Sequence, residues 1–357
     1  MMFRRILVPL DGSARAEQAL PVAARIARAS AGTVILVRAV TSPIDFSWYT
    51  MEAPRSMEAA LNADMEAAKE YIQRVAVSDQ LEGIAVITEV VEGVPTNVIF
   101  STAKTHQADL IVMCSHGETG LKRWILGSVA QKVARHSPIP VLVLRESAGI
   151  PTTLHPEGNR PVRVMVATDN SPLSEEALEP AAYLSAALSA PLHGEVHLVH
   201  ILPLPITSPH DDLADMLVRE HHPAIGDAKA KLAEAAQRLT TGSLAQLQLK
   251  VTHSLLIARD VAETLIEIAE QGEQNREESK PYDVLVMATH GRSGMQRWVM
   301  GSVTERVLGA TRLPLLVVRS HAHSNTHEPL DVTAEVAEVS PDKDKTETPP
   351  SNWVGLL

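Results

Sequence analysis

Two glycine–serine pairs have the spacing of a site that could bind an anion. In the first half of the chain, Cys114-Ser115-His116-Gly117 is followed by nine residues and then by Gly127-Ser128. In the second half, Ala288-Thr289-His290-Gly291 is followed by nine residues and then by Gly301-Ser302. Glycine lets the backbone approach a ligand closely, and a helix that begins at the second pair directs free N–H groups outward. Each half is therefore predicted to offer a phosphate-binding helix N-terminus.

An acidic residue follows the first predicted strand of each half. These segments are Pro9-Leu10-Asp11-Gly12-Ser13 and Ala167-Thr168-Asp169-Asn170-Ser171. Asp followed by Gly or Asn and then Ser is typical of a turn that leads into a helix cap. In open parallel sheets, ligands bind beyond the carboxyl ends of the strands. Asp11 and Asp169 therefore have two interpretations, as organisers of a turn or as the border of a ligand site.

The elements that position these residues alternate between short apolar runs and helical patterns. Near-continuous Val/Ile/Leu runs indicate strands that are buried on both faces, as in a parallel sheet. In the first half, the predicted strands are Ile6–Leu10, Thr33–Val40, Ile84–Val91, Asp109–Cys114 and Val141–Leu144. The predicted helices are Arg15–Ser30, Met57–Val75, Thr96–His106 and Ser128–His136. This alternation predicts an α/β domain with a doubly wound, five-stranded parallel sheet.

The second half repeats the first. Residues 108–145 match residues 282–319 at a constant offset of 174, without a gap. The predicted strands are Arg163–Ala167, Glu195–Leu202, Leu247–Leu255, Asp283–Ala288 and Leu315–Val318, and the long helix is Ile225–Leu239. The chain is therefore predicted to be one domain duplicated, with domain 1 at residues 1–146 and domain 2 at residues 162–320.

The segments outside the repeats have a different composition. Residues 147–161 are rich in proline and glycine and have no periodicity, which predicts a linker. The last 37 residues, 321–357, carry seven Asp/Glu against two Lys and few apolar groups. They are predicted to form a disordered acidic tail, with docking through Trp353 or Leu356-Leu357 as an alternative.

Composition excludes several classes of protein. The chain has 357 residues, 45% of them hydrophobic, and a net charge of −11, which argues against a nucleic-acid partner. No apolar run is long enough to span a membrane, so no membrane partner is expected. A single cysteine excludes an intramolecular disulfide framework. The chain start, Met1–Pro9, lacks the pattern of a signal peptide, so a cytoplasmic protein is expected.

The repeat resembles the universal stress protein family, each copy looking like one UspA-type domain. The resemblance covers about 6–145 and 163–319. The ATP-binding pattern of that family is glycine, two residues, glycine, nine residues, glycine, and serine or threonine. Both copies keep its second part, whereas Cys114 and Ala288 replace its first glycine. The resemblance implies two Rossmann-like domains of the adenine nucleotide alpha hydrolase type, arranged about a pseudo-twofold axis.

The resemblance also implies which residues would meet a nucleotide. Pro9, Asp11 and Asp169 would border the adenosine, and Ala39 and Ile201 would meet the adenine. The phosphates would lie on the residues of the glycine loops and helix starts. The full implied nucleotide-binding set is Pro9, Asp11, Ala39, Met113, Gly117, Gly127, Ser128, Val129, Asp169, Ile201, Met287, Gly291, Gly301, Ser302 and Val303. If only one copy binds, the first is favoured, because Asn170 and Ala167 replace Gly12 and Pro9 in the second.

Catalytic and metal sites are not predicted. The patterns GxxxxGK[ST], GxGxxG and GxSxG are absent. His116 and His290 are interpreted as caps of the loop or phosphate contacts. Trp124 and Trp298 are interpreted as packing against the loop or as a subunit contact. His197 and His200 point to opposite faces of a strand, which spoils them as a chelating pair. At most slow ATP hydrolysis is expected.

These observations lead to a functional hypothesis with one rival. The chain is expected to be a cytoplasmic stress-response protein that binds ATP or AMP, with Mg²⁺ as an open question, and that acts as a sensor or regulator toward an unknown protein partner. The rival is an interaction scaffold that has lost nucleotide binding. The apolar fifth strands, at Pro140–Leu144 and Pro314–Val318, are expected to pair the two copies with each other. A further homodimer is left open.

Overall fold

The computed structural model describes residues 2–41, 53–115, 126–145, 160–203, 223–273, 280–290 and 300–319. For residues 53–57, 223 and 224 it describes the backbone alone. The predicted tail and residues 147–159 of the predicted linker lie outside the described residues. So do five residues discussed above, namely His116, Gly117, Trp124, Gly291 and Trp298.

The first repeat contains a five-stranded parallel sheet. Its strands are β1 (Arg5–Pro9), β2 (Thr33–Val40), β3 (Ala85–Glu92), β4 (Leu110–Cys114) and β5 (Val141–Leu144). They lie in the order β3-β2-β1-β4-β5. The strand order therefore reverses beside β1, between β2 and β4, where open α/β sheets bind their ligands.

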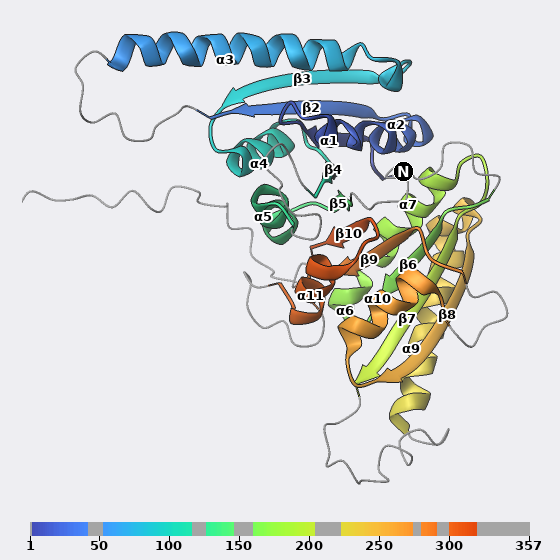
Figure 1. The fold of residues 1–357 in the computed structure, drawn as a ribbon. Coiled ribbons are helices and arrows are strands. Elements are labelled where there is room, and N and C mark those ends of the chain that lie inside the picture. Colours follow the sequence, from blue (N-terminus) through green and yellow to red (C-terminus); the bar gives the residue numbers. More distant parts are fainter. Residues whose placement is uncertain are drawn as a thin grey trace, which may run out of the picture. The chain divides into compact units, whose positions relative to one another are not determined.

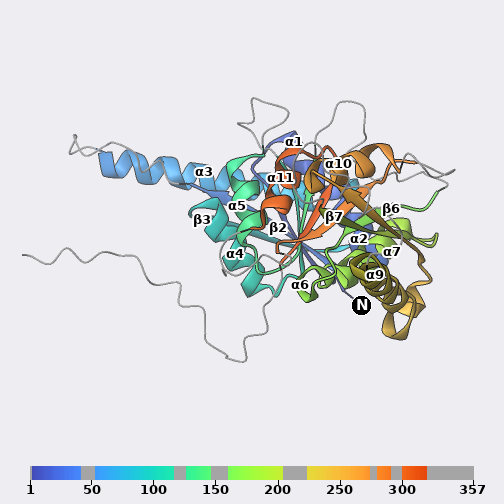
Figure 2. The ribbon, with the colours of Figure 1, turned by 90° about the horizontal axis from the view of Figure 1, so that it is seen from below.

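The helices of the first repeat follow the sequence pattern closely. They are α1 (Ala14–Glu17), α2 (Ala19–Ser30), the short 3-10 helix η1 (Asp79–Leu81), α3 (Ala53–Ala76), α4 (Pro95–Thr105) and α5 (Ser128–His136). The predicted helix at Arg15–Ser30 is divided at Gln18, and α3 begins four residues before the predicted start. Figures 1 and 2 show α3 running alongside β3.

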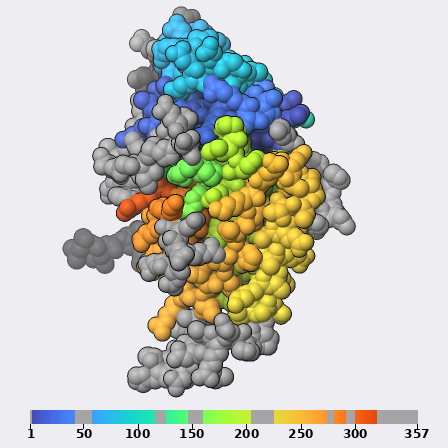
Figure 3. Space-filling model, turned by 90° about the vertical axis from the view of Figure 1, so that its right-hand side faces the viewer, coloured from blue at the N-terminus to red at the C-terminus, as the bar shows by residue number. Residues whose placement is uncertain are grey.

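The second repeat has the same architecture. Its strands are β6 (Arg163–Ala167), β7 (Glu195–Pro203), β8 (Lys250–Ala258), β9 (Val284–Ala288) and β10 (Leu315–Val318). Its helices are α6 (Pro172–Glu175), α7 (Leu178–Ser189), α9 (Pro223–Thr240), η2 (Gly242–Leu247), α10 (Val261–Gln271) and α11 (Ser302–Ala310). The strand predicted from Leu247 begins three residues later because η2 occupies Leu247. Figures 1 and 3 show α9, in yellow, alongside β8, in orange.

The two fifth strands join the repeats. β5 and β10 pair in antiparallel register, with Leu142 opposite Leu316. The result is one ten-stranded sheet. Apart from β5 and β10, all neighbouring strands in it are parallel. The expected pairing of the two copies through these strands is thus present in the structure.

Both faces of the eight inner strands are largely buried, as the near-continuous apolar runs predict, whereas the edge strands β3 and β8 are partly exposed, because each has a neighbouring strand on one side only. Successive residues of β1 alternate between the faces: Ile6 and Val8 pack with α2 and α3, whereas Leu7 packs with α4 and α5. In the second repeat, α7 and α9 cover the first of these faces, and α10 and α11 cover the second. This double cover fixes the strand ends, and with them the residues that follow each strand.

Candidate functional site

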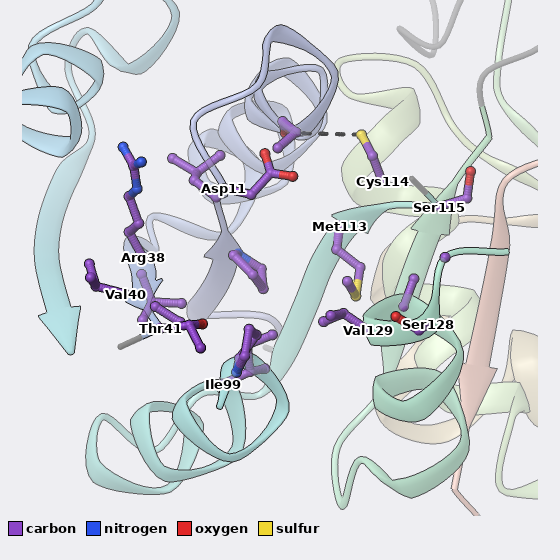
Figure 4. A pocket seen from close by; sticks show the side chains of 18 of the residues that line it. Asp11, Arg38, Val40, Thr41, Ile99, Met113, Cys114, Ser115, Ser128 and Val129 are labelled. Atoms are coloured by element: carbon purple, nitrogen blue, oxygen red, sulfur yellow. Dashed lines mark hydrogen bonds between the residues drawn. The ribbon is translucent and has the colours of Figure 1, made fainter. Parts of the chain in front are cut away.

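The carboxyl ends of β1, β2 and β4 surround a pocket with a volume of about 590 Å³, which α5 closes on one side (Figure 4). It lies at the reversal of strand order in the first repeat. Seven of the residues singled out from the sequence line it, namely Pro9, Asp11, Ala39, Met113, Gly127, Ser128 and Val129. The eighth from this repeat, Gly117, lies outside the described residues.

The carboxylate of Asp11 is held by the turn that follows β1. Its Oδ1 accepts hydrogen bonds from the Ser13 backbone N–H at 2.9 Å and from the Ser13 hydroxyl at 2.6 Å. Ser13 in turn caps α1, because its Oγ accepts from the N–H of Ala16 at 3.2 Å. Asp11 therefore organises the turn and lines the pocket at the same time, so the two interpretations of this residue are compatible.

The start of α5 forms the opposite wall. Gly127 is the extended N-cap residue, and no side chain caps the helix within the described part of the chain. The N–H of Gly127 donates to the Ser115 carbonyl at 2.8 Å, which fixes the helix start against the end of β4. The first N–H groups of a helix have no intrahelical acceptor. Since Ser128, Val129 and Ala130 line the pocket, this uncapped helix start borders its interior.

The second repeat brings its corresponding residues together in the same way. Ala167, Asp169, Ile201, Met287, Gly301, Ser302 and Val303 line one pocket at the carboxyl ends of β6, β7 and β9. Asp169 accepts from the Ser171 N–H at 3.0 Å, and Gly301 donates to the Thr289 carbonyl at 2.8 Å. This pocket, however, has a volume of only about 130 Å³. Gly291 lies outside the described residues.

Comparison with known proteins agrees with this geometry. The model of the universal stress protein family matches residues 2–145 and again residues 162–319. The chain belongs to the universal stress protein family.

Some relatives match a single repeat of the chain, and others match nearly all of it. A universal stress protein of Methanocaldococcus jannaschii is 34% identical over 146 residues, which are 41% of this chain and 84% of the relative. One from Mycolicibacterium smegmatis is 27% identical over 321 residues, 88% of this chain and 96% of the relative, so the tandem arrangement is shared. The crystal structure of a universal stress protein from Archaeoglobus fulgidus covers 89% of this chain and 99% of its own, with a TM-score of 0.57 at 20% identity. That likeness concerns the fold.

Asn170 distinguishes the second repeat of this universal stress protein from the first. It stands where the first repeat has Gly12, and both residues have a positive φ, 57° and 95°. The Asn170 side chain is buried, and its amide donates to the Ala228 carbonyl of α9 at 3.0 Å. The nearby Thr168 and Ser174 hydroxyls bond to each other at 2.9 Å. Thr168 and Ser174 both line the second pocket, so their hydroxyls are engaged with each other at its wall.

Several residues that line the first pocket were not predicted from the sequence. Arg38, Val40, Thr41, Asp64, Ala67, Pro95, Ile99, Cys114 and Ser115 line it as well. Cys114 is only partly buried, and its sulfur lies 4.0 Å from the Ala16 carbonyl oxygen. Arg38 precedes Ala39 on β2, so its position next to an implied site residue was the available signal. Asp64 and Ala67 come from α3, whose contact with the pocket is long-range and leaves no local pattern.

Two histidines of this universal stress protein, His197 and His290, form hydrogen bonds with nearby hydroxyl groups. His290 lines the second pocket, and its Nδ1 is 3.0 Å from the Thr289 hydroxyl. His197 is buried and bonds to Thr252 and to Ser254 at 2.7 and 2.9 Å. Among the described residues, no group of three or more His, Cys, Asp or Glu side chains could hold a metal ion. No helix in the same part of the chain is long and apolar enough to cross a membrane.

Proposed function

We propose that this universal stress protein binds one adenine nucleotide per chain, ATP or AMP, in the pocket of the first repeat. Nucleotide occupancy then regulates its interaction with a protein partner in a cytoplasmic stress response. Any Mg²⁺ would arrive with the ATP phosphates. The observation that carries the proposal is the pocket of about 590 Å³ between the turn of Asp11 and the uncapped start of α5.

The two pocket volumes support one site rather than two. Small-molecule sites have volumes of about 300–1,000 Å³. The first pocket falls within this range and the second, at about 130 Å³, falls below it. The phosphates would take the N–H groups at Ser128 and Val129, together with Gly117. The adenosine would lie along Pro9, Asp11, Ala39 and Met113.

A pair of matched substitutions tests the proposal. Ser128→Asp places a carboxylate at the helix start where the phosphates would lie, and Ser302→Asp does the same in the second repeat. An acidic residue in the first turn favours the helix dipole, so both variants should fold. Titration calorimetry with ATP and AMP should show binding to the wild type and to S302D, and its loss in S128D. Equal binding by S128D and the wild type would contradict the proposal.

The rival function is a scaffold that binds proteins without nucleotide. Mass spectrometry of the denatured, purified protein separates the two. Co-purified ATP or AMP near one per chain supports the nucleotide site, whereas its absence, with no thermal shift on adding nucleotide, supports the scaffold. Phosphate release from ATP measures turnover in the same samples, and slow or no release is expected because no catalytic base or nucleophile pattern is present.

A further inference from the structure

The first pocket has a cationic group at the end that faces away from α5. Figure 4 shows Arg38 and Ser128 at opposite ends of the pocket, with Asp11 between them. Arg38 belongs to β2 and is half-buried. Its guanidinium therefore lies on the far side of Asp11 from the helix start proposed to hold the 5′ phosphates.

The guanidinium of Arg38 is held by packing. Its Cζ lies 4.8 Å from the centre of the Tyr71 ring. A Cβ on Gly12 would be 3.2 Å from Nη2 and 3.3 Å from both Cζ and Nη1, so a flat face of the group lies against the Gly12 backbone. Tyr71 is buried, and its hydroxyl donates to Glu17 Oε1 at 2.9 Å. Burial and this bond raise the pKa of Tyr71, which keeps the phenol neutral.

These are packing contacts, so they use none of the N–H donors of the guanidinium. Within the described part of the chain, no carboxylate or carbonyl forms a hydrogen bond or ion pair with Arg38. A guanidinium presents several N–H donors in a planar fork that matches phosphate and carboxylate oxygens. Because packing restricts its rotamers, less entropy is lost when such an anion binds.

The second repeat shows that the fold does not need this group. Val37 pairs with Pro9 as Val199 pairs with Ala167, so His200 stands at the position of Arg38. His200 is 1% exposed, and Asn170 replaces Gly12. The half-buried cation therefore lines the larger pocket alone, and the glycine beside it is present only in the first repeat.

We propose that Arg38 selects adenine nucleotides that carry a phosphate on the ribose 2′ or 3′ oxygen. This inference rests on the proposed function, which places the 5′ phosphates at Ser128 and the ribose at Asp11. The 2′ and 3′ oxygens then lie on the side of Arg38. One carboxylate oxygen of Asp11 already accepts two bonds from Ser13, which reduces its repulsion of a phosphate nearby. Asp64 lines the same pocket but is exposed, so water screens its charge.

The test compares ligands that differ only in the ribose substituent. The full chain is titrated with AMP, adenosine 2′,5′-bisphosphate and adenosine 3′,5′-bisphosphate. Charge-assisted bonds to a guanidinium predict that one bisphosphate binds about tenfold more tightly than AMP. The tighter of the two identifies the oxygen that carries the phosphate. The preference should shrink as the salt concentration rises.

Three variants assign the preference to Arg38. R38H introduces the residue of the second repeat and should bring the ratio of the two dissociation constants close to one. R38K keeps the charge but loses the planar fork, so an intermediate ratio is expected. R74A is the matched control, because Arg74 also lies over Tyr71, at 5.4 Å, but does not line the pocket. R74A should keep the wild-type ratio.

The outcomes separate this inference from the proposed function. AMP binding with no preference for either bisphosphate overturns the role of Arg38 and leaves the nucleotide site standing. A preference that R38H retains has the same consequence. If the wild type binds ATP but neither bisphosphate, the role of Arg38 is overturned; if it binds none of ATP, AMP and the two bisphosphates, both proposals fall. Thermal unfolding of each variant shows whether the variant is still folded, so that a lost preference is not mistaken for a loss of the fold.

Discussion

The Nη2 group of Arg145 donates a hydrogen bond to the Leu308 carbonyl of the other repeat. Arg145 follows β5, and its counterpart after β10, Arg319, donates to the His136 carbonyl at 3.2 Å. Each guanidinium thus reaches a carbonyl in the last turn of the partner repeat's helix, α11 or α5, where a cation opposes the negative end of the helix dipole. The antiparallel pairing of β5 with β10 produces this reciprocity. The helix that starts at the proposed phosphate site therefore ends at a residue bound by the second repeat.

Replacing Arg145 with alanine should weaken the joint between the repeats. Arg145 is 8% exposed, and burial lowers the pKa of its guanidinium to about 10, so it remains charged at neutral pH. Its loss leaves a carbonyl without its donor, at a cost of about 1–3 kcal/mol in the free energy of unfolding. Urea unfolding measures this cost. R319A, which removes the more exposed bond, is the control and should cost less; an equal or smaller effect of R145A would show that its bond does not stabilise the joint.

Stability should fall as the solution becomes acidic, in part through His136. Burial, and then the charges of Arg135, Arg319 and Lys132, lower the pKa of His136 below its ordinary value of 6.5. The unfolded chain then binds a proton more readily than the folded one, so the contribution of His136 is present above pH 6.5 and is lost as the pH falls. Urea unfolding at pH 7.5 and 5.5 should show a smaller difference for H136Q than for the wild type. The same difference in both proteins would rule out this contribution.

Cys114 provides a built-in reporter of the proposed site. It is the only cysteine in the chain, and it lines the first pocket. A nucleotide in that pocket should slow alkylation of the thiol by N-ethylmaleimide, because it restricts access to the sulfur. The rate is followed by mass spectrometry with and without ATP. S302D should retain the protection and S128D should lose it, whereas protection that persists in S128D would mean that ATP acts elsewhere.

The buried polar cluster around His197 should be sensitive to single changes but tolerant of paired ones. His197 Nε2 lies 2.9 Å from Glu273 Oε1, and both side chains are at most 10% exposed. By strand register, Ile35 occupies the matching position in the first repeat, opposite Ile87, whereas His197 is opposite Thr252. H197I should lower the free energy of unfolding by about 1–3 kcal/mol, because the Glu273 carboxylate loses a partner.

The double variant H197I/E273L should recover part of that loss, because both polar partners are then replaced by apolar groups. T252A is the control for the His197 cluster, since Thr252 is exposed and water can replace its bond. Urea unfolding compares the three variants with the wild type. A double variant that is less stable than H197I would show that Glu273 has other essential contacts.

The sequence alone determined the duplication, the fold and the place of the candidate site. Apolar runs of four to nine residues, near-continuous in most cases and separated by helical patterns, correspond to the ten observed strands within a few residues. The helix starts at Ser128 and Ser302 occur where the Gly-Ser pairs predict them. These features are local: a strand, a turn or a cap depends on neighbours that are close in the chain.

Only the tertiary structure decided how the two pockets differ. Asn170 bonds to Ala228, 58 residues away. Arg38 lies over the ring of Tyr71, a residue of α3, which packs against the sheet. Arg145 meets Leu308 at a separation of 163 residues. Such contacts depend on the packing of whole elements, which no local spacing encodes. The two near-identical motifs border cavities of about 590 and 130 Å³. The motif predicts the helix start at each pocket, whereas residues from other elements, such as Arg38 and Asp64, complete the lining of the first.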